Sequence, residues 1–589
     1  MQKPIEFYTS QKLYFEQELK SIKKQLSVSS TIRFILFVST VLGVYIFRGN
    51  VKIMVFIAVL WAITFLFLIL RHGKLQYNRS FNKALLEINN TELKVLNGNF
   101  STLDQGDEFI NQNHFYSYDI DLFGKRSFFQ YCNRTVTQEG KTTFANYLTE
   151  NDICNIKEKQ YSIKELSEKP AWRQQFSALA SLVKVEFSAK EIVKWIHDYK
   201  AVFPKLLAVL PLVFSIISGI LICLAIFKII PFIVVVLWLF LGLGISGAFL
   251  KKVNVLYVYS SKTKETFKQY NQLLNEIETT SFKTPVLIKK QQEIKTETRK
   301  ASAIFAEFSK MLDALDQRNN LIVAFVGNGF LLWDLMQVYK IEKWIETYKT
   351  KVEIWFEVIA FFDAQNSLAT FAFNHPNYTF PKINKSNTVI STKDLGHFLL
   401  KDTVRINNDF KIENQQFFIV TGANMAGKST FLRTVSLSIV MANMGLPVCA
   451  RTFEYSPIKL ITSMRTTDSL ADDESYFFSE LKRLKFIVDE IVNEDYFIIL
   501  DEILKGTNST DKAIGSKKFV QKLVASNSTG IIATHDLSLC EIENELTAIE
   551  NYYFDAEIIN NQLNFDYKLK QGVCKNMNAS FLLKQMKIV

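Results

Sequence analysis

A short apolar run that leads directly into a glycine-containing loop is the feature that most constrains the fold of this chain. The run covers residues 417–420, and the loop at 421–430 has the spacing G-x-x-x-x-G-K-[ST] from Gly422 to Ser429. This order predicts a buried strand, a loop whose amides face a phosphate, and a helix whose positive N-terminal end points at the same phosphate. A chance glycine-rich turn before an ordinary helix is the alternative. The complete match favours an α/β domain that binds a nucleoside triphosphate.

Each residue of this loop has an expected role. Gly422 and Gly427 allow the backbone to bend, Lys428 is predicted to reach the β- and γ-phosphates, and Ser429 to hold Mg²⁺. ATP and Mg²⁺ are therefore the predicted cofactors. The predicted nucleotide-binding residues are Gly422, Asn424, Met425, Gly427, Lys428, Ser429 and Thr430.

Two further strand ends carry groups that suit hydrolysis. Residues 496–500 form an apolar run followed by Asp501 and Glu502, and residues 530–533 lead into His535. Asp501 would hold Mg²⁺ through water, while Glu502 would polarise the attacking water. His535 stands where ABC-type ATPases place a γ-phosphate sensor, although a structural histidine is the alternative. The predicted catalytic residues are Glu502 and His535, and the predicted metal ligands are Ser429 and Asp501.

Four apolar runs arranged as two pairs predict membrane-spanning hairpins. The first pair covers residues 31–47 and 53–70, and the second covers 206–227 and 229–250. A helix of 22 residues, the length of each run in the second pair, is about 33 Å long, enough to cross the hydrocarbon layer. Helical hairpins buried in a large core are the alternative. Lysines and arginines that flank the pairs favour cytoplasmic polar segments, as does the need for cytosolic ATP. We therefore expect a multi-pass protein of the cytoplasmic (inner) membrane, with the ATPase domain in the cytoplasm.

The positive charge of the chain lies outside the predicted nucleotide domain. The formal net charge is +11, yet residues 401–589 hold 21 Lys and Arg against 24 Asp and Glu, which leaves 48 basic and 34 acidic residues in the first 400. This excess would suit nucleic acid or anionic lipid headgroups, and a solvated helical surface is the alternative. The six cysteines include no C-x-x-C pair, which argues against a zinc site or a disulfide framework.

Taken together, these motifs resemble the MutS family of DNA mismatch repair ATPases. The loop reads T-G-A-N-M-A-G-K-S-T, so Ala423 and Ala426 replace a proline and a glycine of the family pattern. After Asp501 and Glu502, the family's G-T-S-T-x-D appears here with Asn508 and Ser509 at the third and fourth positions and Asp511 at the last. Further similarity covers Ala-Thr-His at 533–535 and, upstream, the segments 121–124, 133–141 and 362–369.

The resemblance implies a homodimer, because in MutS-like ATPases the loop around Asn508 and Ser509 completes the partner's site. Asn508, Ser509 and Asp511 are thus expected to act in trans. The chain also departs from the family pattern in two places. Its first hundred residues do not fit the family's mismatch-binding domain, and the C-terminal helix-turn-helix extension is expected to be missing. The expected fold is an α/β P-loop ABC-type ATPase domain preceded by an all-α MutS-like core with two transmembrane helical hairpins.

The expected domains follow from these boundaries. They are a cytoplasmic N-terminal helix (1–30), transmembrane hairpin 1 (31–71), a linker and helix (72–114), the first segment of the MutS-like helical core (115–204), transmembrane hairpin 2 (205–252), the second segment of that core (253–385) and a MutS-type ATPase domain (386–589).

Two functions fit this organisation. The first is a membrane-anchored, dimeric, DNA-binding ATPase of the mismatch repair or recombination class, with DNA and the lipid bilayer as partners. The second is an ABC-type ATP switch that acts on a protein partner without binding DNA. A transporter is less favoured, because four helices per chain are few and no acidic residue within the membrane runs marks a substrate path.

Overall fold

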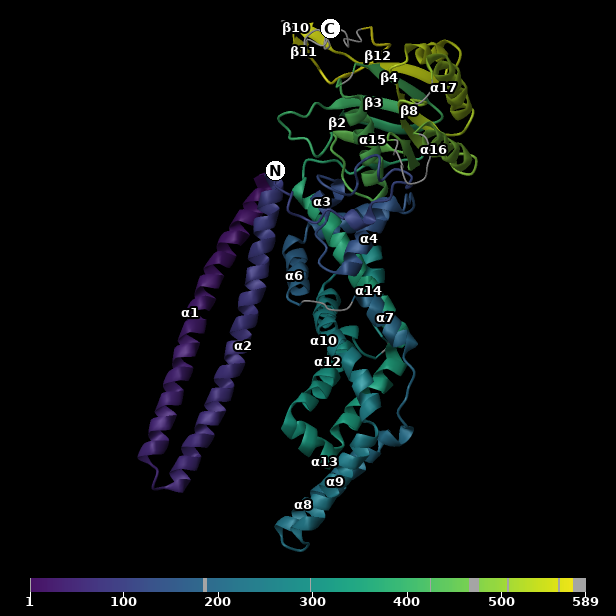
Figure 1. The fold of residues 1–589 in the computed structure, drawn as a ribbon. Helices are drawn as coiled ribbons and strands as arrows, with labels where there is room; N and C mark the ends of the chain where they lie inside the picture. The colour runs from purple at the N-terminus through teal and green to yellow at the C-terminus, as the bar shows by residue number, and fades with distance from the viewer. Residues whose placement is uncertain are drawn as a thin grey trace.

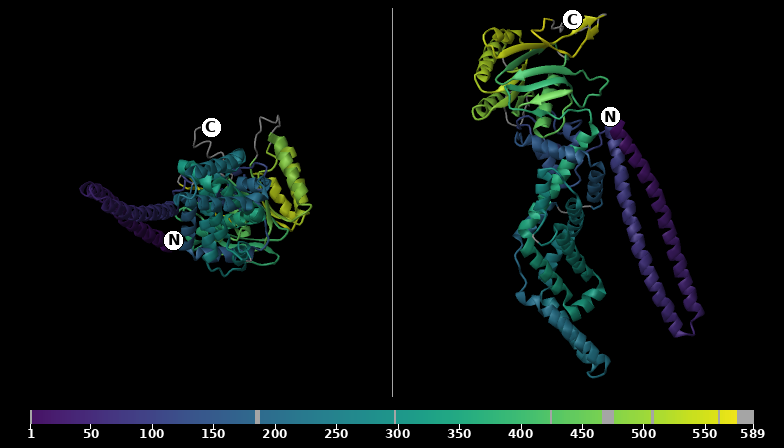
Figure 2. Two further views of the ribbon diagram at one scale, coloured as in Figure 1. Left: turned by 90° about the horizontal axis from the view of Figure 1, so that it is seen from below. Right: turned by 180° about the vertical axis from the view of Figure 1, so that it is seen from behind.

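The chain folds into a long helical body with an α/β domain at one end, and a separate helical hairpin lies beside the body (Figure 1). The computed structural model describes residues 2–183, 188–296, 298–423, 425–465, 476–505, 508–559 and 562–575. Both views in Figure 2 show the N-terminal hairpin leaving the body at an angle and standing apart from it along most of its length. A mixed helical and α/β architecture was predicted, and it is confirmed at this level.

The N-terminal hairpin consists of two continuous helices, α1 (Gln2–Ile46) and α2 (Val51–Leu96). The side chain of Asn50 caps α2 by accepting a hydrogen bond from the Ile53 amide. Both helices are long and apolar enough to cross a membrane. At about 1.5 Å per residue, each helix is roughly twice as long as the hydrocarbon layer is thick. The apolar runs at 31–47 and 53–70 occupy only the half of each helix nearer the turn. The expected boundaries at 30/31 and 71/72 fall inside these helices.

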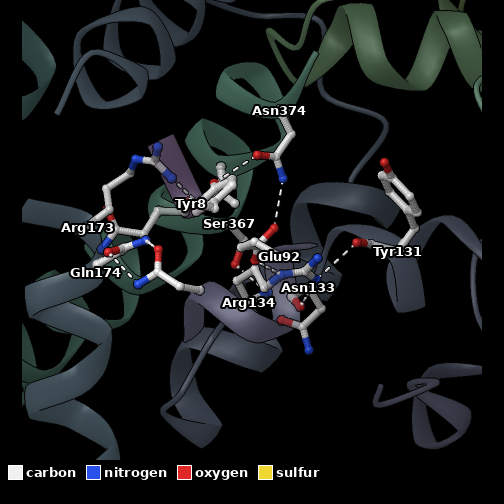
Figure 3. A network of polar contacts seen from close by, with 12 residues as sticks. Tyr8, Glu92, Tyr131, Asn133, Arg134, Arg173, Gln174, Ser367 and Asn374 are labelled. Carbon is white, nitrogen blue, oxygen red and sulfur yellow. Dashed lines mark hydrogen bonds and ion pairs between the residues drawn. The ribbon is translucent and has the colours of Figure 1, made fainter. Parts of the chain in front are cut away.

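A buried polar network fixes the base of this hairpin to the body (Figure 3). The Tyr8 hydroxyl donates to Asn374 Oδ1 over 2.8 Å, and Asn374 Nδ2 donates to Glu92 Oε2 over 2.8 Å. Glu92 also forms an ion pair with Arg134, whose backbone amide donates to Ser367 Oγ over 2.9 Å. The network therefore joins α1 and α2 to the C-terminal end of α14.

The helical body is built around α14 (Trp333–Asn374), a helix of 42 residues. Its apolar side chains pack with aromatic residues of neighbouring helices, among them Phe267, Phe305 and Phe308. Lys295 and Lys300, which lie between two of these helices, form an isolated bridge. The other helices of the body are α3 (Phe128–Cys132), α4 (Gln138–Thr149), α5 (Ile156–Ser167), α6 (Pro170–Ser181), α7 (Ala189–Asp198), α10 (Leu250–Thr279), α11 (Pro285–Glu293), α12 (Ala301–Asp316) and α13 (Asn328–Leu331).

The second apolar pair forms a shorter hairpin than predicted. Its helices α8 (Leu210–Ile226) and α9 (Phe232–Ala248) have 17 residues each, not 22. Pro211 lies in the first turn of α8 and Pro231 caps α9, and proline is favoured where a helix begins. A 65° bend separates α9 from α10. Taken singly, α8 and α9 are thus shorter than a full membrane span.

The C-terminal domain contains a six-stranded sheet with the order β12-β9-β4-β8-β7-β6, in which only β12 is antiparallel to its neighbour. A four-stranded sheet with the order β1-β5-β2-β3 and the β10-β11 pair complete the domain. Its helices are α15 (Lys428–Asn443), α16 (Tyr476–Glu490) and α17 (Ser509–Val524). The strands are β1 (Lys382–Ile383), β2 (Thr388–Leu395), β3 (Asn408–Glu413), β4 (Phe417–Gly422), β5 (Thr452–Tyr455), β6 (Lys459–Ser463), β7 (Tyr496–Asp501), β8 (Thr529–Ala533), β9 (Ile549–Phe554), β10 (Glu557–Ile559), β11 (Gln562–Asn564) and β12 (Leu569–Gln571).

Candidate nucleotide-binding site

The predicted site residues meet at the carboxyl ends of three adjacent parallel strands, β4, β8 and β7. Val420 and Asp501 both pair with Ala533, so the segments that follow these strands emerge side by side. Ligands of open α/β sheets bind at this edge. The register of the sheet therefore brings together the loop after β4, the carboxylates after β7 and the histidine after β8.

The loop after β4 has the backbone that its glycines allow. Gly422 has a φ of +146° and Gly427 a φ of +106°, both in the region that favours glycine. A Cβ atom on Gly422 would lie 2.6 Å from the carbonyl oxygen of Phe554. Met425 has a φ of +68° and an exposed side chain, while Asn424 lies outside the described residues. Both glycines are thus required by the shape of the loop.

Lys428 begins α15 and turns its ammonium back into the loop. Its Nζ donates to the carbonyl oxygens of Gly422 (2.7 Å) and Ala423 (3.2 Å) and lies 3.3 Å from His535 Nε2. Burial lowers the pKa of this ammonium, and the carboxylates of Asp501 and Glu502 oppose the shift. The loop therefore holds a positive charge beside backbone amides at a helix N-terminus, an arrangement that attracts phosphate.

Ser429 and Asp501 form a pair of oxygen donors next to this lysine. Ser429 Oγ donates to Asp501 Oδ2 over 2.8 Å. Mg²⁺ prefers oxygen ligands and is usually held by one or two protein groups together with substrate phosphates and water. Among the described residues, no group of three His, Cys, Asp or Glu side chains forms a separate metal site. The Ser429–Asp501 pair fits a magnesium ion that is shared with a nucleotide. Thr430 follows as the next residue of α15.

Glu502 and His535 are in direct contact. His535 Nε2 lies 3.0 Å from Glu502 Oε1, and Lys505 Nζ lies 3.6 Å from Glu502 Oε2. The hydrogen bond from His535, helped by Lys505, lowers the pKa of Glu502 to about 2 despite partial burial. The Glu502 backbone has a φ of +54°, and its amide donates to Ala533 O over 2.9 Å. Glu502 is therefore ionised at neutral pH and held toward the histidine.

The residues expected to act in trans lie at the start of α17. Asn508 caps this helix, because its Oδ1 accepts from the Asp511 amide over 2.9 Å and its Nδ2 donates to Asp511 Oδ2 over 2.7 Å. Both side chains are exposed. Residues 506–507 and the side chain of Ser509 lie outside the described portion of the chain. An exposed helix start is accessible to a second copy, and the role in trans stays a prediction.

A cavity of about 320 Å³ lies beside the loop and was not predicted from the sequence. Gly427 and Thr430 line it from the loop and α15, and His397 and Tyr567 line it from two distant segments. Burial lowers the pKa of His397 to about 4, so the ring is neutral at pH 7. An apolar and aromatic cavity next to a phosphate loop has the size and chemistry to hold a nucleoside. No local motif joins these residues, which lie far apart in the sequence.

A second missed feature connects the site to the helical body. Arg465, after β6, donates to both carboxylate oxygens of Asp121 over 2.6 and 2.8 Å. Arg433 of α15 lies 3.4 Å from the same carboxylate. The Arg465 amide and the Thr462 hydroxyl both donate to Asp119. The helix that follows the loop is thereby tied to the segment at 119–121.

Comparison with known proteins supports the family resemblance. Residues 418–586 match the profile of MutS domain V. The chain is 32% identical to "MutS protein homolog 4" of Homo sapiens over 29% of this chain and 19% of that protein, and 30% identical to "DNA mismatch repair protein MutS" of Clostridium tetani over 39% and 27%. "DNA mismatch repair protein MutS" of Methanosarcina acetivorans is 28% identical over 56% of this chain and 34% of its own length. The chain therefore spans between about a fifth and a third of these relatives. The matches support the resemblance of the C-terminal domain to MutS proteins.

Proposed function

We propose that this chain, whose residues 418–586 correspond to MutS domain V, is a membrane-anchored switch that binds and hydrolyses ATP. One observation carries the proposal: the segments that follow three adjacent strands bring Ser429 into contact with Asp501, and His535 into contact with both Lys428 and Glu502. The relatives are named as mismatch repair and MutS homologue proteins, which supports placing the chain in the mismatch repair and recombination class of ATPases.

In the proposed mechanism, the loop amides and Lys428 bind the phosphates of ATP. Ser429 and Asp501 hold Mg²⁺, which would neutralise charge on the β- and γ-phosphates. Glu502 orients and polarises the attacking water, and His535 holds Glu502 in place while it faces the γ-phosphate. The ionised state of Glu502 suits this role, because a carboxylate that is already deprotonated can accept a hydrogen bond from water.

Membrane anchoring is supported by the direction of the two apolar hairpins. The turn of α1–α2 and the turn of α8–α9 both lie toward the end of the molecule that is remote from the α/β domain (Figure 1). Large apolar side chains of both hairpins are exposed, including Phe34, Phe56 and Phe67 in the first and Phe232 and Phe240 in the second. A bilayer at this end would cover them and leave the ATPase domain in the cytoplasm. We place the protein in the inner membrane as a homodimer.

The lysine of the loop gives the simplest test. Lys428→Ala should abolish binding of a fluorescent ATP analogue, because it removes the only side-chain cation predicted to contact the phosphates. The matched control is Lys517→Ala on α17, whose ammonium pairs with Glu545 over 2.5 Å. The control should bind as the unchanged protein does. Equal binding by both variants contradicts the proposed phosphate site.

DNA binding is the second candidate function, and the basic excess of the first 400 residues favours it. If it holds, duplex DNA should bind the detergent-solubilised protein with an affinity that falls steeply as salt rises, because bound counterions are released. If duplex DNA does not bind even at low salt, DNA binding is excluded, and the ATP switch acting without DNA remains the proposed function.

A further inference from the structure

An apolar segment between α12 and α14 lies against the second hairpin, α8–α9. The sequence did not predict this contact. Residues 320–331 form a π-helical turn (Val323–Gly327) followed by α13. No charged residue occurs between Arg318 and Asp334. Leu321 is 85% exposed, Ile322 71%, and Phe325 50%. Exposure of so many large apolar side chains within 12 residues is unfavourable in water and marks a surface that contacts something apolar.

The segment packs on α9 through two glycines. A Cβ atom on Gly242 would lie 2.2 Å from the carbonyl oxygen of Gly329, and a Cβ atom on Gly329 would lie 2.8 Å from Leu239 Cγ. Small residues at such a contact let two helices approach closely, which is the usual way that helices associate within a bilayer. The close approach makes α8, α9 and residues 320–331 one structural unit.

Hydrogen bonds from α8 satisfy the backbone where the segment ends. Ser218 Oγ donates to the carbonyl oxygen of Phe330 over 2.7 Å, and Trp238 Nε1 donates to Ser218 Oγ over 2.8 Å. Ser218 is buried. Backbone carbonyls at the end of a short helix lack partners within that helix, and they must find partners from protein when no water is present. Ser218 therefore supplies a partner for a carbonyl at the end of a short helix, as a position without water requires.

The charged residues that bound this uncharged stretch are Arg318 and Asp334, and we call this pair the neck of the segment. Arg318 Nε lies 3.3 Å from Asp334 Oδ2, and the Arg318 guanidinium lies over the Tyr257 ring at 5.2 Å. Both side chains of the ion pair are largely buried. The neck thus brings residues 318 and 334 together, so the intervening chain leaves the body and returns to it on the same side.

A groove of about 730 Å³ lies between α12 and α14, on the side of the neck away from residues 320–331. Three lysines line it, Lys310 from α12 and Lys340 and Lys343 from α14. Within the described residues, no carboxylate forms an ion pair with these three, whereas Arg299 in the same groove pairs with Glu307 over 2.5 Å. Lys340 lies seven residues, about 10 Å of helix, from Trp333, where the apolar segment ends. The free positive charge is therefore close to the level at which the apolar surface begins.

We propose that residues 320–331 are a re-entrant segment that enters the bilayer beside α8 and α9, and that the lysine groove binds the phosphate headgroups of anionic lipids. The proposal rests on the membrane anchoring proposed above and adds a third membrane element and a lipid class to it. The apolar surface with its satisfied backbone suits the hydrocarbon core, and the adjacent lysines suit the anionic headgroups, whereas DNA would leave the apolar surface uncovered.

The insertion is tested with a fluorophore on single cysteines of the full-length protein, reconstituted in vesicles whose lipids carry bromine on their acyl chains. The exposed Cys154 and Cys223 are first replaced by serine. Bromine should quench label on Ile322→Cys and, in hairpin α1–α2, on Phe56→Cys, but not on Leu400→Cys in the α/β domain. Quenching at Phe56→Cys without quenching at Ile322→Cys overturns the re-entrant segment and leaves the anchoring intact. No quenching at either position overturns both.

The groove is tested with the triple variant Lys310→Glu, Lys340→Glu and Lys343→Glu in vesicles that contain photoactivatable phosphatidylglycerol. Cross-linking to peptides of α12 and α14 should fall by roughly fivefold per lysine, since each contributes about that factor near an anionic surface. The control changes Lys517, Lys518 and Lys522 of α17 to Glu and should cross-link normally. Unchanged cross-linking in the groove variant overturns the lipid assignment. So does duplex DNA binding that is lost only in that variant, because the groove would then bind nucleic acid.

Discussion

At the scale of single residues, the contact between Glu502 and His535 determines what the site can do. His535 Nε2 lies 3.0 Å from the Glu502 carboxylate and helps to keep it ionised, while Lys428 Nζ lies 3.3 Å from the same histidine nitrogen. If nucleotide binding and hydrolysis use different residues, a substitution can remove one step and leave the other intact. In the proposed mechanism, binding depends on Lys428 and hydrolysis on Glu502.

Glu502→Gln should therefore bind ATP normally but hydrolyse it roughly 10²–10⁴ times more slowly, the range that general-base groups contribute. The amide keeps the size of the side chain and removes its charge. Steady-state phosphate release, measured beside binding of an ATP analogue, separates the two steps. The control Glu545→Gln changes an exposed carboxylate on the same domain. Near-normal turnover in the Glu502 variant would remove that residue from the mechanism.

A second residue-scale prediction concerns His375, where α14 meets the α/β domain. Its Nε2 lies 2.9 Å from the Tyr131 hydroxyl, and burial lowers its pKa to about 3. The unfolded chain, with an ordinary pKa near 6.5, takes up the proton first as pH falls. Stability conferred by the neutral ring is therefore complete above pH 6.5 and is lost toward pH 3, by about 2 kcal/mol between pH 7 and 5. The apparent thermal midpoint should fall over this interval, and it should fall less in His375→Gln. An identical fall in both proteins counts against this assignment.

At the scale of elements, polar and apolar contacts at the base of α1–α2 attach this hairpin to the body. The polar contacts form the network of Tyr8, Glu92, Arg134 and Asn374 (Figure 3), and the apolar contacts include a buried cluster of Leu85 with Ala178 of α6. Any change in α14 that follows nucleotide binding would reach the hairpin through this network.

Substitutions in the network should differ in size. Glu92→Ala leaves the Arg134 guanidinium buried without its partner, which costs about 3–5 kcal/mol, whereas Tyr8→Phe removes one neutral hydrogen bond worth about 1 kcal/mol. Limited proteolysis should therefore release the hairpin from the body readily in Glu92→Ala and only slightly in Tyr8→Phe. Equal protection of both variants would show that other contacts hold the hairpin.

Local patterns in the sequence predicted the elements that are continuous in the chain. The strand, loop and helix around Lys428 and the strand before Asp501 lie where expected, because each rests on a single short run with its own turn residues. The assignment of their residues to phosphate and metal binding stays a prediction. Hairpin 1 was also recognisable from its apolar runs.

Features that depend on distant segments could not be predicted. The nucleoside-sized cavity combines His397, Thr430 and Tyr567, and no spacing rule relates these positions. Residues 320–331 are too short for a membrane span, so length alone gave no reason to group them with α8 and α9. The lengths of α8 and α9 were overestimated because a hydropathy run does not show that the helices begin at Leu210 and after Pro231.

At the scale of the whole molecule, the site and the apolar hairpins lie toward opposite ends of one helical body (Figures 1 and 2). Nucleotide chemistry at one end and a bilayer at the other would be coupled through α14, which runs between them. We propose that these two properties belong to one protein.

Flotation of ATPase activity tests this claim most directly. Full-length protein in lipid vesicles is washed with concentrated salt, which screens surface attraction but leaves inserted helices in place, and is then centrifuged through a density gradient. Lys428-dependent ATP hydrolysis should float with the vesicles. Lys428-dependent hydrolysis that stays with soluble protein at the bottom of the gradient would contradict it.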